Sequence, residues 1–152
     1  MRKTNESGRS MVEMLGVLAI IGVLSVGGIA GYTMAMRSYQ ANEILQAASM
    51  LAMEARLKES STALKASDIG IKKIPGMTKV GEGATGDSDL QATYASGKVT
   101  VSTTDNIDKA IGNAVCAKLT TDTSKLVYAD GTCKDGTIKI IYNYNEVASG
   151  EE

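Results

Sequence analysis

An apolar run near the N-terminus constrains this chain more than any other feature. From Met14 to Ala30 the only polar side chain is Ser25. A helix needs roughly 20 mostly apolar residues to cross a bilayer, and the run reaches that length with the apolar residues that flank it. A secretory signal peptide usually has an apolar core of only about 7–15 residues. The run therefore predicts a membrane-spanning helix instead of a cleaved signal peptide, and a plain signal anchor is the simplest protein that would carry one.

A carboxylate stands at the start of this run. Glu13 follows the basic and polar residues Arg9 and Ser10 and directly precedes the apolar residues. A charged group costs about 2.5–3.5 kcal/mol at the centre of a membrane helix and less near its end. Since a simple anchor gains nothing from this charge, we expect the Glu13 carboxylate to need a partner.

Gly8, then Arg9-Ser10-Met11-Val12-Glu13, then the apolar run resemble the N-terminus of type IV prepilins and pseudopilins. The likeness covers about the first 35 residues, and the glycine, the position of the glutamate and the uninterrupted helix all coincide. The chain departs from the family pattern in two places. Arg9 stands where the first mature residue is most often phenylalanine, and Ala30 stands where many members have a proline.

The resemblance implies processing and assembly. A prepilin peptidase would cut between Gly8 and Arg9, the new amine of Arg9 would be methylated, and Glu13 would assist assembly. The implied partners are that peptidase, membrane lipid before assembly, an assembly platform in the inner membrane, and identical subunits in a helical filament. The implied parts are a leader at 1–8, a transmembrane and filament-core helix at 9–31, and an exported head at 32–152 that includes the second half of the helix.

The function that the resemblance implies is that of a structural subunit of a type IV-like pilus, whether for adhesion, motility, DNA uptake or conjugation. A pseudopilin of a type II secretion-like system and a minor pilin are alternatives of the same class. A membrane-anchored, exported binding domain that never polymerises is an alternative of another class. The short leader is similar to the IVa branch and the helix before Cys116 to the IVb branch, so both subclasses stay open.

The charges beside the run predict its orientation. Arg2, Lys3 and Arg9 lie on its N-terminal side, and basic residues favour the cytoplasmic side of a membrane helix. We therefore expect an inner-membrane precursor with a cytoplasmic N-terminus and a periplasmic head, which the resemblance would carry on to an extracellular pilus.

Helical spacing continues beyond the run. Ile44, Ala48, Leu51 and Ala55 fall on one face of a helix, with good helix formers between them. The pattern predicts one helix from about Ser10 to about Leu64, whose second half packs a stripe of alanine and methionine against a sheet. The glycine-rich stretch 27–31 is consistent with close helix packing or with a point where the helix can unwind, and both remain possible.

The rest of the chain predicts a small antiparallel sheet and a short helix, which makes the fold class α+β. We expect a long connection from Ser60 to about Gly97, in which Asp87 and Asp89 form a solvated turn, although carboxylates at that spacing can ligate calcium. The expected elements are strands at 98–103, 125–129 and 137–144, and a helix at 107–119 with Asp105 as its N-cap.

Cys116 and Cys133 are the only cysteines. Their spacing is not that of a metal site or of a redox Cys-x-x-Cys pair. Because the head is expected to be exported, a structural disulfide is the preferred interpretation. Pilins often carry such a bond in their C-terminal half, which the resemblance extends to this pair.

Composition argues against catalysis and nucleic-acid binding. The chain has no His, Phe or Trp and a formal net charge of −1. His-dependent triads and His-ligated zinc are thereby excluded, and neither a basic surface nor a set of stacking aromatics is present for nucleic acid. We expect no enzyme activity, no cofactor and no metal.

Processing can be tested on the intact protein. We expect assembled material to begin at Arg9 and to lack residues 1–8, because Gly8 allows the backbone into a tight peptidase cleft. Gly8→Leu should block the cut, whereas Ser10→Ala should not. Intact mass spectrometry measures both, and assembled protein that retains residues 1–8 would contradict the prediction.

Overall fold

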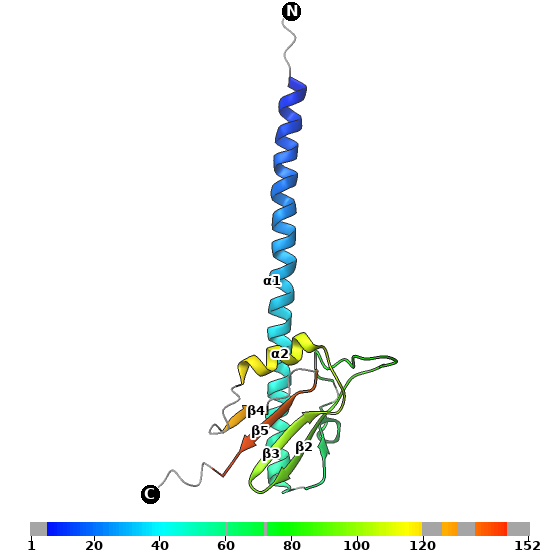
Figure 1. Cartoon of the computed structure of the whole chain (residues 1–152), viewed down its shortest axis with the longest axis vertical. Coiled ribbons are helices and arrows are strands. Elements are labelled where there is room, and N and C mark those ends of the chain that lie inside the picture. The colour runs from blue at the N-terminus through cyan, green and yellow to red at the C-terminus, as the bar shows by residue number, and fades with distance from the viewer. Residues whose placement is uncertain (1–5, 60, 72, 120–125, 131–135, 146–152) are drawn as a thin grey trace, which may run out of the picture. The chain divides into compact units, whose positions relative to one another are not determined.

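The computed structural model describes residues 6–59, 61–71, 73–119, 126–130 and 136–145, with side chains from Met11 onward. The chain divides into two compact units, Met1–Met36 and Arg37–Glu152. The element order is α1, β1, η1, β2, β3, α2, β4 and β5 (Figure 1). The fold is α+β, with a long N-terminal apolar helix and an antiparallel five-stranded sheet.

Helix α1 spans Glu6–Leu57. It contains a segment that is long and apolar enough to cross a membrane, and none of that segment is buried. The helix ends earlier than the sequence predicts, because Glu59 adopts a left-handed backbone conformation with φ 44° and its N–H donates to the carbonyl of Arg56. Leu64, expected in the helix, instead pairs with Ala92 in the sheet.

The second half of α1 buries one stripe of side chains in the head. Ile44, Ala48, Leu51 and Ala55 are fully buried, as their helical spacing predicts. The alanines of this stripe belong to the same buried cluster as Val99, Val101 and Ile140 of the sheet. The hydrophobic effect contributes about 25 cal/mol per Å² of apolar surface removed from water, so this contact supplies the core of the head.

All five strands pair antiparallel in the order β1-β2-β3-β5-β4. Val101 of β3 lies between Ala92 of β2 and Ile140 of β5, and all three are fully buried. Figure 1 shows β2, β3 and β5 side by side over the head half of α1. The strand bounds are Leu64–Lys65, Leu90–Ala95, Lys98–Thr103, Val127–Ala129 and Lys139–Asn143 for β1 to β5.

The three expected strands are present, β3 with the predicted bounds and the other two shorter. The expectation of a long connection between 60 and 97 is wrong. This stretch contains β1, the 3₁₀ helix η1 (Ala66–Ile69) and β2. Strand β2 alternates buried Leu90 and Ala92 with less buried residues, but its small apolar residues gave only a weak alternation in the sequence. Pairing with β3 decides its conformation.

Helix α2 spans Lys109–Lys118, and Ile111 and Val115 bury its inner face. Its N-cap is Asp108, whose carboxylate accepts a hydrogen bond from the N–H of Ala110, so the prediction of Asp105 as N-cap is wrong. Asp105 instead pairs with Lys79 at 3.0 Å. The extended segment before the helix explains this shift, because the N–H of Ile107 donates to the carbonyl of Gly136 and delays the first helical turn.

The two faces of α1 in the head predict a large and a small effect of the same truncation. Leu51 is fully buried, whereas Leu57 is 79% exposed. Leu51→Ala should lower the free energy of unfolding by about 2–5 kcal/mol through lost contacts and a cavity, and Leu57→Ala by less than about 0.5 kcal/mol. Urea unfolding of the full chain in detergent, followed by tyrosine fluorescence, measures both. Equal losses would contradict the packing.

Candidate assembly surface

The first half of α1 exposes apolar side chains on all sides. Every large apolar residue from Met11 to Ile29 is at least 53% exposed. Monomeric soluble proteins rarely expose contiguous apolar patches of more than a few hundred Å². This surface must therefore be covered by lipid or by protein.

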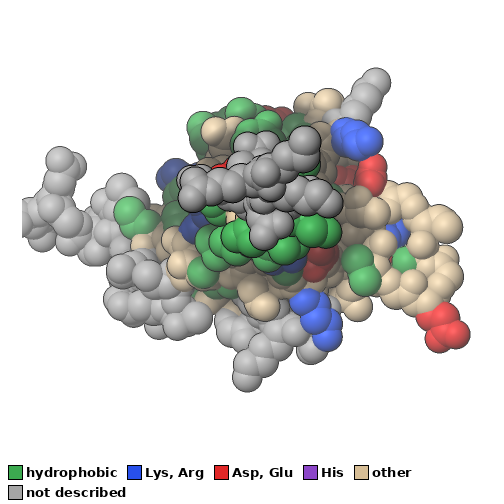
Figure 2. Space-filling view, turned by 90° about the horizontal axis from the view of Figure 1, so that it is seen from above, with side chains coloured by type: hydrophobic (Ala, Val, Ile, Leu, Met, Phe, Trp, Pro, Cys, Tyr) green, Lys and Arg blue, Asp and Glu red, His purple; other side chains and the backbone are tan. Residues whose placement is uncertain are grey.

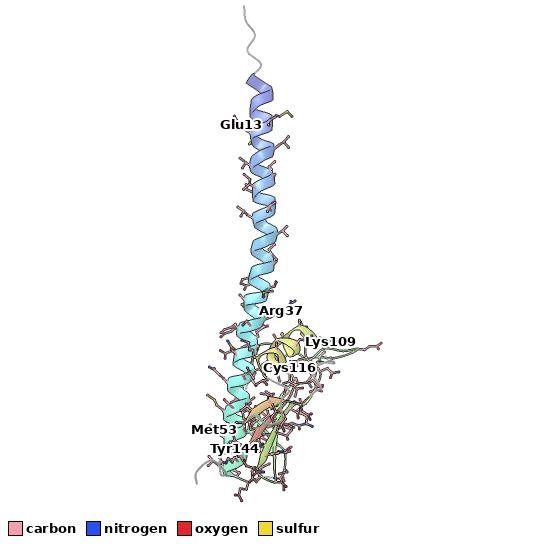
Figure 3. All side chains as sticks on the ribbon, turned by 60° about the vertical axis from the view of Figure 1, so that its left-hand side comes forward. Glu13, Arg37, Met53, Lys109, Cys116 and Tyr144 are labelled. Carbon is pink, nitrogen blue, oxygen red and sulfur yellow. The ribbon has the colours of Figure 1, made fainter. Side chains whose placement is uncertain are left out.

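The residues expected to direct processing and assembly lie at the start of α1. The backbones of Gly8 and Arg9 lie in its first turns, and the Arg9 side chain is outside what the structure describes. Glu13 is exposed between Val12 and Met14, so its carboxylate stands on an apolar surface. Figure 3 marks its place on the helix.

A second, separate stripe of exposed apolar side chains lies on the head half of α1. Met50, Met53 and Leu57 are 59%, 62% and 79% exposed, and their spacing of three and four residues places them on one face. The expectation that the methionines pack against the sheet is therefore wrong for Met50 and Met53, whereas the alanines do pack. The sequence carried only a weak signal for this stripe, because Glu43 and Gln46 interrupt the same helix face between Tyr39 and Met50.

A groove of about 500 Å³ borders this stripe. Met53, Arg56 and Leu57 line it from α1, and Tyr94 and Tyr144 from the sheet side. The guanidinium carbon of Arg56 lies 4.2 Å from the centre of the Tyr144 ring, a cation–π contact. Burial raises the pKa of the Tyr144 hydroxyl, and the charge of Arg56 opposes that shift. Figure 3 shows Met53 and Tyr144 near the C-terminal end of α1.

Sequence reasoning missed this groove. Arg56 and Tyr144 are far apart in the sequence, and only the pairing of β5 with β3 brings the residues after β5 to the end of α1. The residues around Arg56 in the sequence do not indicate which tyrosine it will contact. The large number of intervening residues explains why the contact could not be predicted.

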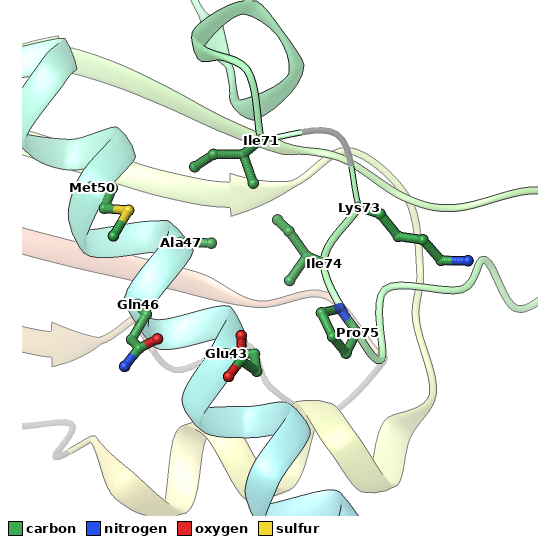
Figure 4. A pocket seen from close by; sticks show the side chains of 8 residues that line it. All are labelled: Glu43, Gln46, Ala47, Met50, Ile71, Lys73, Ile74 and Pro75. Carbon is green, nitrogen blue, oxygen red and sulfur yellow. The ribbon is translucent and has the colours of Figure 1, made fainter.

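A smaller hollow of about 150 Å³ lies on another side of the helix, between Glu43, Ala47 and the loop at Ile74 (Figure 4). Figure 4 shows the ammonium group of Lys73 extending away from Glu43. The lining is mainly apolar, and its polar groups do not converge on a common point. This hollow offers no arrangement of acid, base and nucleophile.

The two aspartates considered for a cation are used within the fold. The carboxylate of Asp89 accepts hydrogen bonds from the Ser67 hydroxyl at 2.7 Å and from the N–H of Leu90 at 2.8 Å. Asp87 forms a backbone bridge with Thr78. Within the described residues no group of three or more Cys, Asp or Glu side chains is placed to hold a metal ion.

The cysteines are only partly described. Cys116 lies on α2, and the described part of the chain holds no free cysteine. Cys133 lies outside the described residues, so its pairing with Cys116 stays a prediction.

The comparisons with known proteins leave the family open. No family model, curated protein or solved structure matches this chain. Its function has to be argued from its own residues.

Thiol labelling tests the cysteine pairing. In non-reduced, denatured protein we expect neither cysteine to label, and Cys116→Ser should expose one labelled thiol at Cys133. The lost bond should cost about 3 kcal/mol in the chain-entropy model, and Cys133→Ser should cost the same. Unfolding of the single and double variants measures this cost. Full labelling of both cysteines in the non-reduced, denatured wild-type protein would contradict the pairing.

Proposed function

We propose that the chain is a structural subunit that polymerises through α1 into a type IV-like pilus after its first eight residues are removed. One observation carries this proposal: besides the apolar stretch of membrane length, α1 exposes a separate apolar stripe in its head half. Met50, Met53 and Leu57 are all more than half exposed there.

Lipid accounts for only part of this surface. A bilayer covers roughly 20 helical residues, which the stretch from Met11 to Tyr32 supplies. Leu57 lies a further 25 residues along the sequence. The apolar half of a neighbouring subunit's helix can cover the first stretch in place of lipid, and a surface of a neighbouring head can cover the stripe at Met50, Met53 and Leu57. A helical filament of identical subunits provides such neighbours.

Glu13 gives the assembly a directional element. An unpaired carboxylate in an apolar filament core is costly, and a cation from a neighbour offsets much of that cost. Cleavage after Gly8 creates an amine at Arg9 and makes Glu13 the fifth residue of the mature chain. The guanidinium of Arg9 offers a second cation at the same end.

The alternatives use the same residues differently. A pseudopilin or minor pilin would share the helix contacts but form short or mixed assemblies. An anchored binding domain that never polymerises would need only the first half of α1, and would leave the stripe at Met50, Met53 and Leu57 without a role. Protein found in sheared surface filaments favours the pilin, and protein confined to the membrane fraction favours the anchored domain.

Two variants test the proposal against a matched control. Glu13→Leu should leave a processed, membrane-inserted subunit but reduce filament yield by about tenfold or more, an effect equivalent to ~1.4 kcal/mol per contact. Met53→Gln, which makes the stripe more polar, should reduce yield in the same direction. Lys109→Gln, on the exposed start of α2, should leave it unchanged.

Quantitative immunoblotting of the sheared and membrane fractions measures these yields. A wild-type chain that is absent from the sheared fraction would contradict polymerisation. Normal filament yield from Glu13→Leu would contradict the ion pair but leave the helix contacts standing.

A further inference from the structure

The loop between residues 79 and 87 is a hairpin whose tip is held by backbone hydrogen bonds. The N–H of Lys79 donates to the carbonyl of Gly86 at 3.0 Å, and the N–H of Ala84 donates to that of Gly81 at 3.2 Å. A bridge between Thr78 and Asp87 closes its base. These bonds hold the tip in one shape.

The base of this hairpin is fixed to the segment before α2. The N–H of Val80 donates to the carbonyl of Asn106 at 2.9 Å, and Lys79 Nζ lies 3.0 Å from Asp105 Oδ2. The hydrogen bonds from Lys79 and from Thr104 hold the pKa of the Asp105 carboxyl below its ordinary value.

The tip presents one charge among small residues. Glu82 is exposed and stands between Gly81 and Gly83, which have φ of 148° and 75°. Val80, beside it, is 52% exposed. Figure 1 shows this loop projecting from the head at the level of α2, and Figure 2 shows from above an acidic side chain at the outer end of the projection. Among the described residues Glu82 has no ion-pair partner.

The groove at the end of α1 offers a positive charge and an apolar wall, which complement Glu82 and Val80 of the loop. Arg56 stacks on Tyr144, which holds its guanidinium plane and leaves its N–H donors available, and no carboxylate in the described part of the chain pairs with it. Met53 and Leu57 supply an apolar wall. A guanidinium fixed in this way is suited to bind a carboxylate.

We propose that this groove receives the 80–86 loop of a second copy, with Glu82 bound to Arg56 and Val80 packed against Met53 and Leu57. This contact rests on the proposed polymerisation, because it is the head contact that such a filament would use. The loop and the groove are different surfaces of the same head, so the contact is heterologous. Heterologous contacts that do not close into a ring generate open helical assemblies.

Glu59 also lines the groove, and its charge offers a second test of the contact. Its carboxylate would repel an incoming Glu82 and weaken the contact. Removal of this charge by Glu59→Gln should therefore strengthen the contact, whereas a groove that serves only as a solvated surface would not respond.

A charge exchange tests the pair in the full-length chain. A photo-crosslinking amino acid placed at Thr85 reports contact between copies as a band of twice the subunit mass, and mass spectrometry identifies the peptide that it joins. We expect a joined peptide that contains Arg56, and a loss of the band by about tenfold in Arg56→Glu and in Glu82→Arg. The double variant should recover most of the band. Lys109→Glu, a matched charge reversal elsewhere on the head, should have no effect.

The outcomes separate this contact from polymerisation itself. The cross-link is measured in membranes and in sheared filaments, so a chain that forms no filaments would contradict the proposed function while its membrane cross-link still decides the contact. Single variants that match wild type, or a double variant that recovers nothing, would overturn the contact. Sensitivity to Arg56→Glu without sensitivity to Glu82→Arg would also overturn it, since the groove would then bind another anion.

Discussion

The burial of one face of α1 by the sheet is the contact on which the rest of the head depends. Ile44, Leu51 and Ala55 are fully buried there, opposite Val101 and Ile140 of the central strands. The chain has no Phe or Trp, so this core is built mainly from alanine and from branched aliphatic side chains. A thin core of this kind tolerates little loss, because net folding stability is typically only about 5–15 kcal/mol.

The first half of α1 and the stripe at Met50, Met53 and Leu57 remain apolar and exposed, and this exposure links the fold to the proposed function. Apolar helix contacts are strong in sum but weakly directional, so a bundle of such helices can slide without a large change in energy. Under the proposed function, the charge at Glu13 would fix the register within the helix bundle. The hairpin at Glu82 and the groove at Arg56 would fix it between heads. Charge pairs are effective in this role because a wrong register leaves a charge without a partner.

Local pattern predicted the parts of this protein that depend on neighbours in sequence. The buried stripe at Ile44 and Leu51 followed from helical spacing, and strand β3 followed from alternation. The same reasoning placed the N-cap at Asp105 instead of Asp108, because it could not see that Ile107 is bonded to Gly136. It also missed β2, whose conformation depends on pairing with β3. The sequence indicated the part of the candidate assembly surface that lies at Gly8, Arg9 and Glu13. The structure describes side chains there only from Met11 onward.

The sequence by itself determined the long apolar helix, since the run from Met14 to Ala30 has a single polar side chain and a helix satisfies its backbone hydrogen bonds within the segment. It also determined which helix face meets the sheet. Only the tertiary structure decided that Met53 stays exposed, that Arg56 stacks on Tyr144, and that Glu82 stands at the end of an anchored hairpin. The physical reason is range: periodicity is set within a few residues, whereas these positions depend on strand pairings between distant segments.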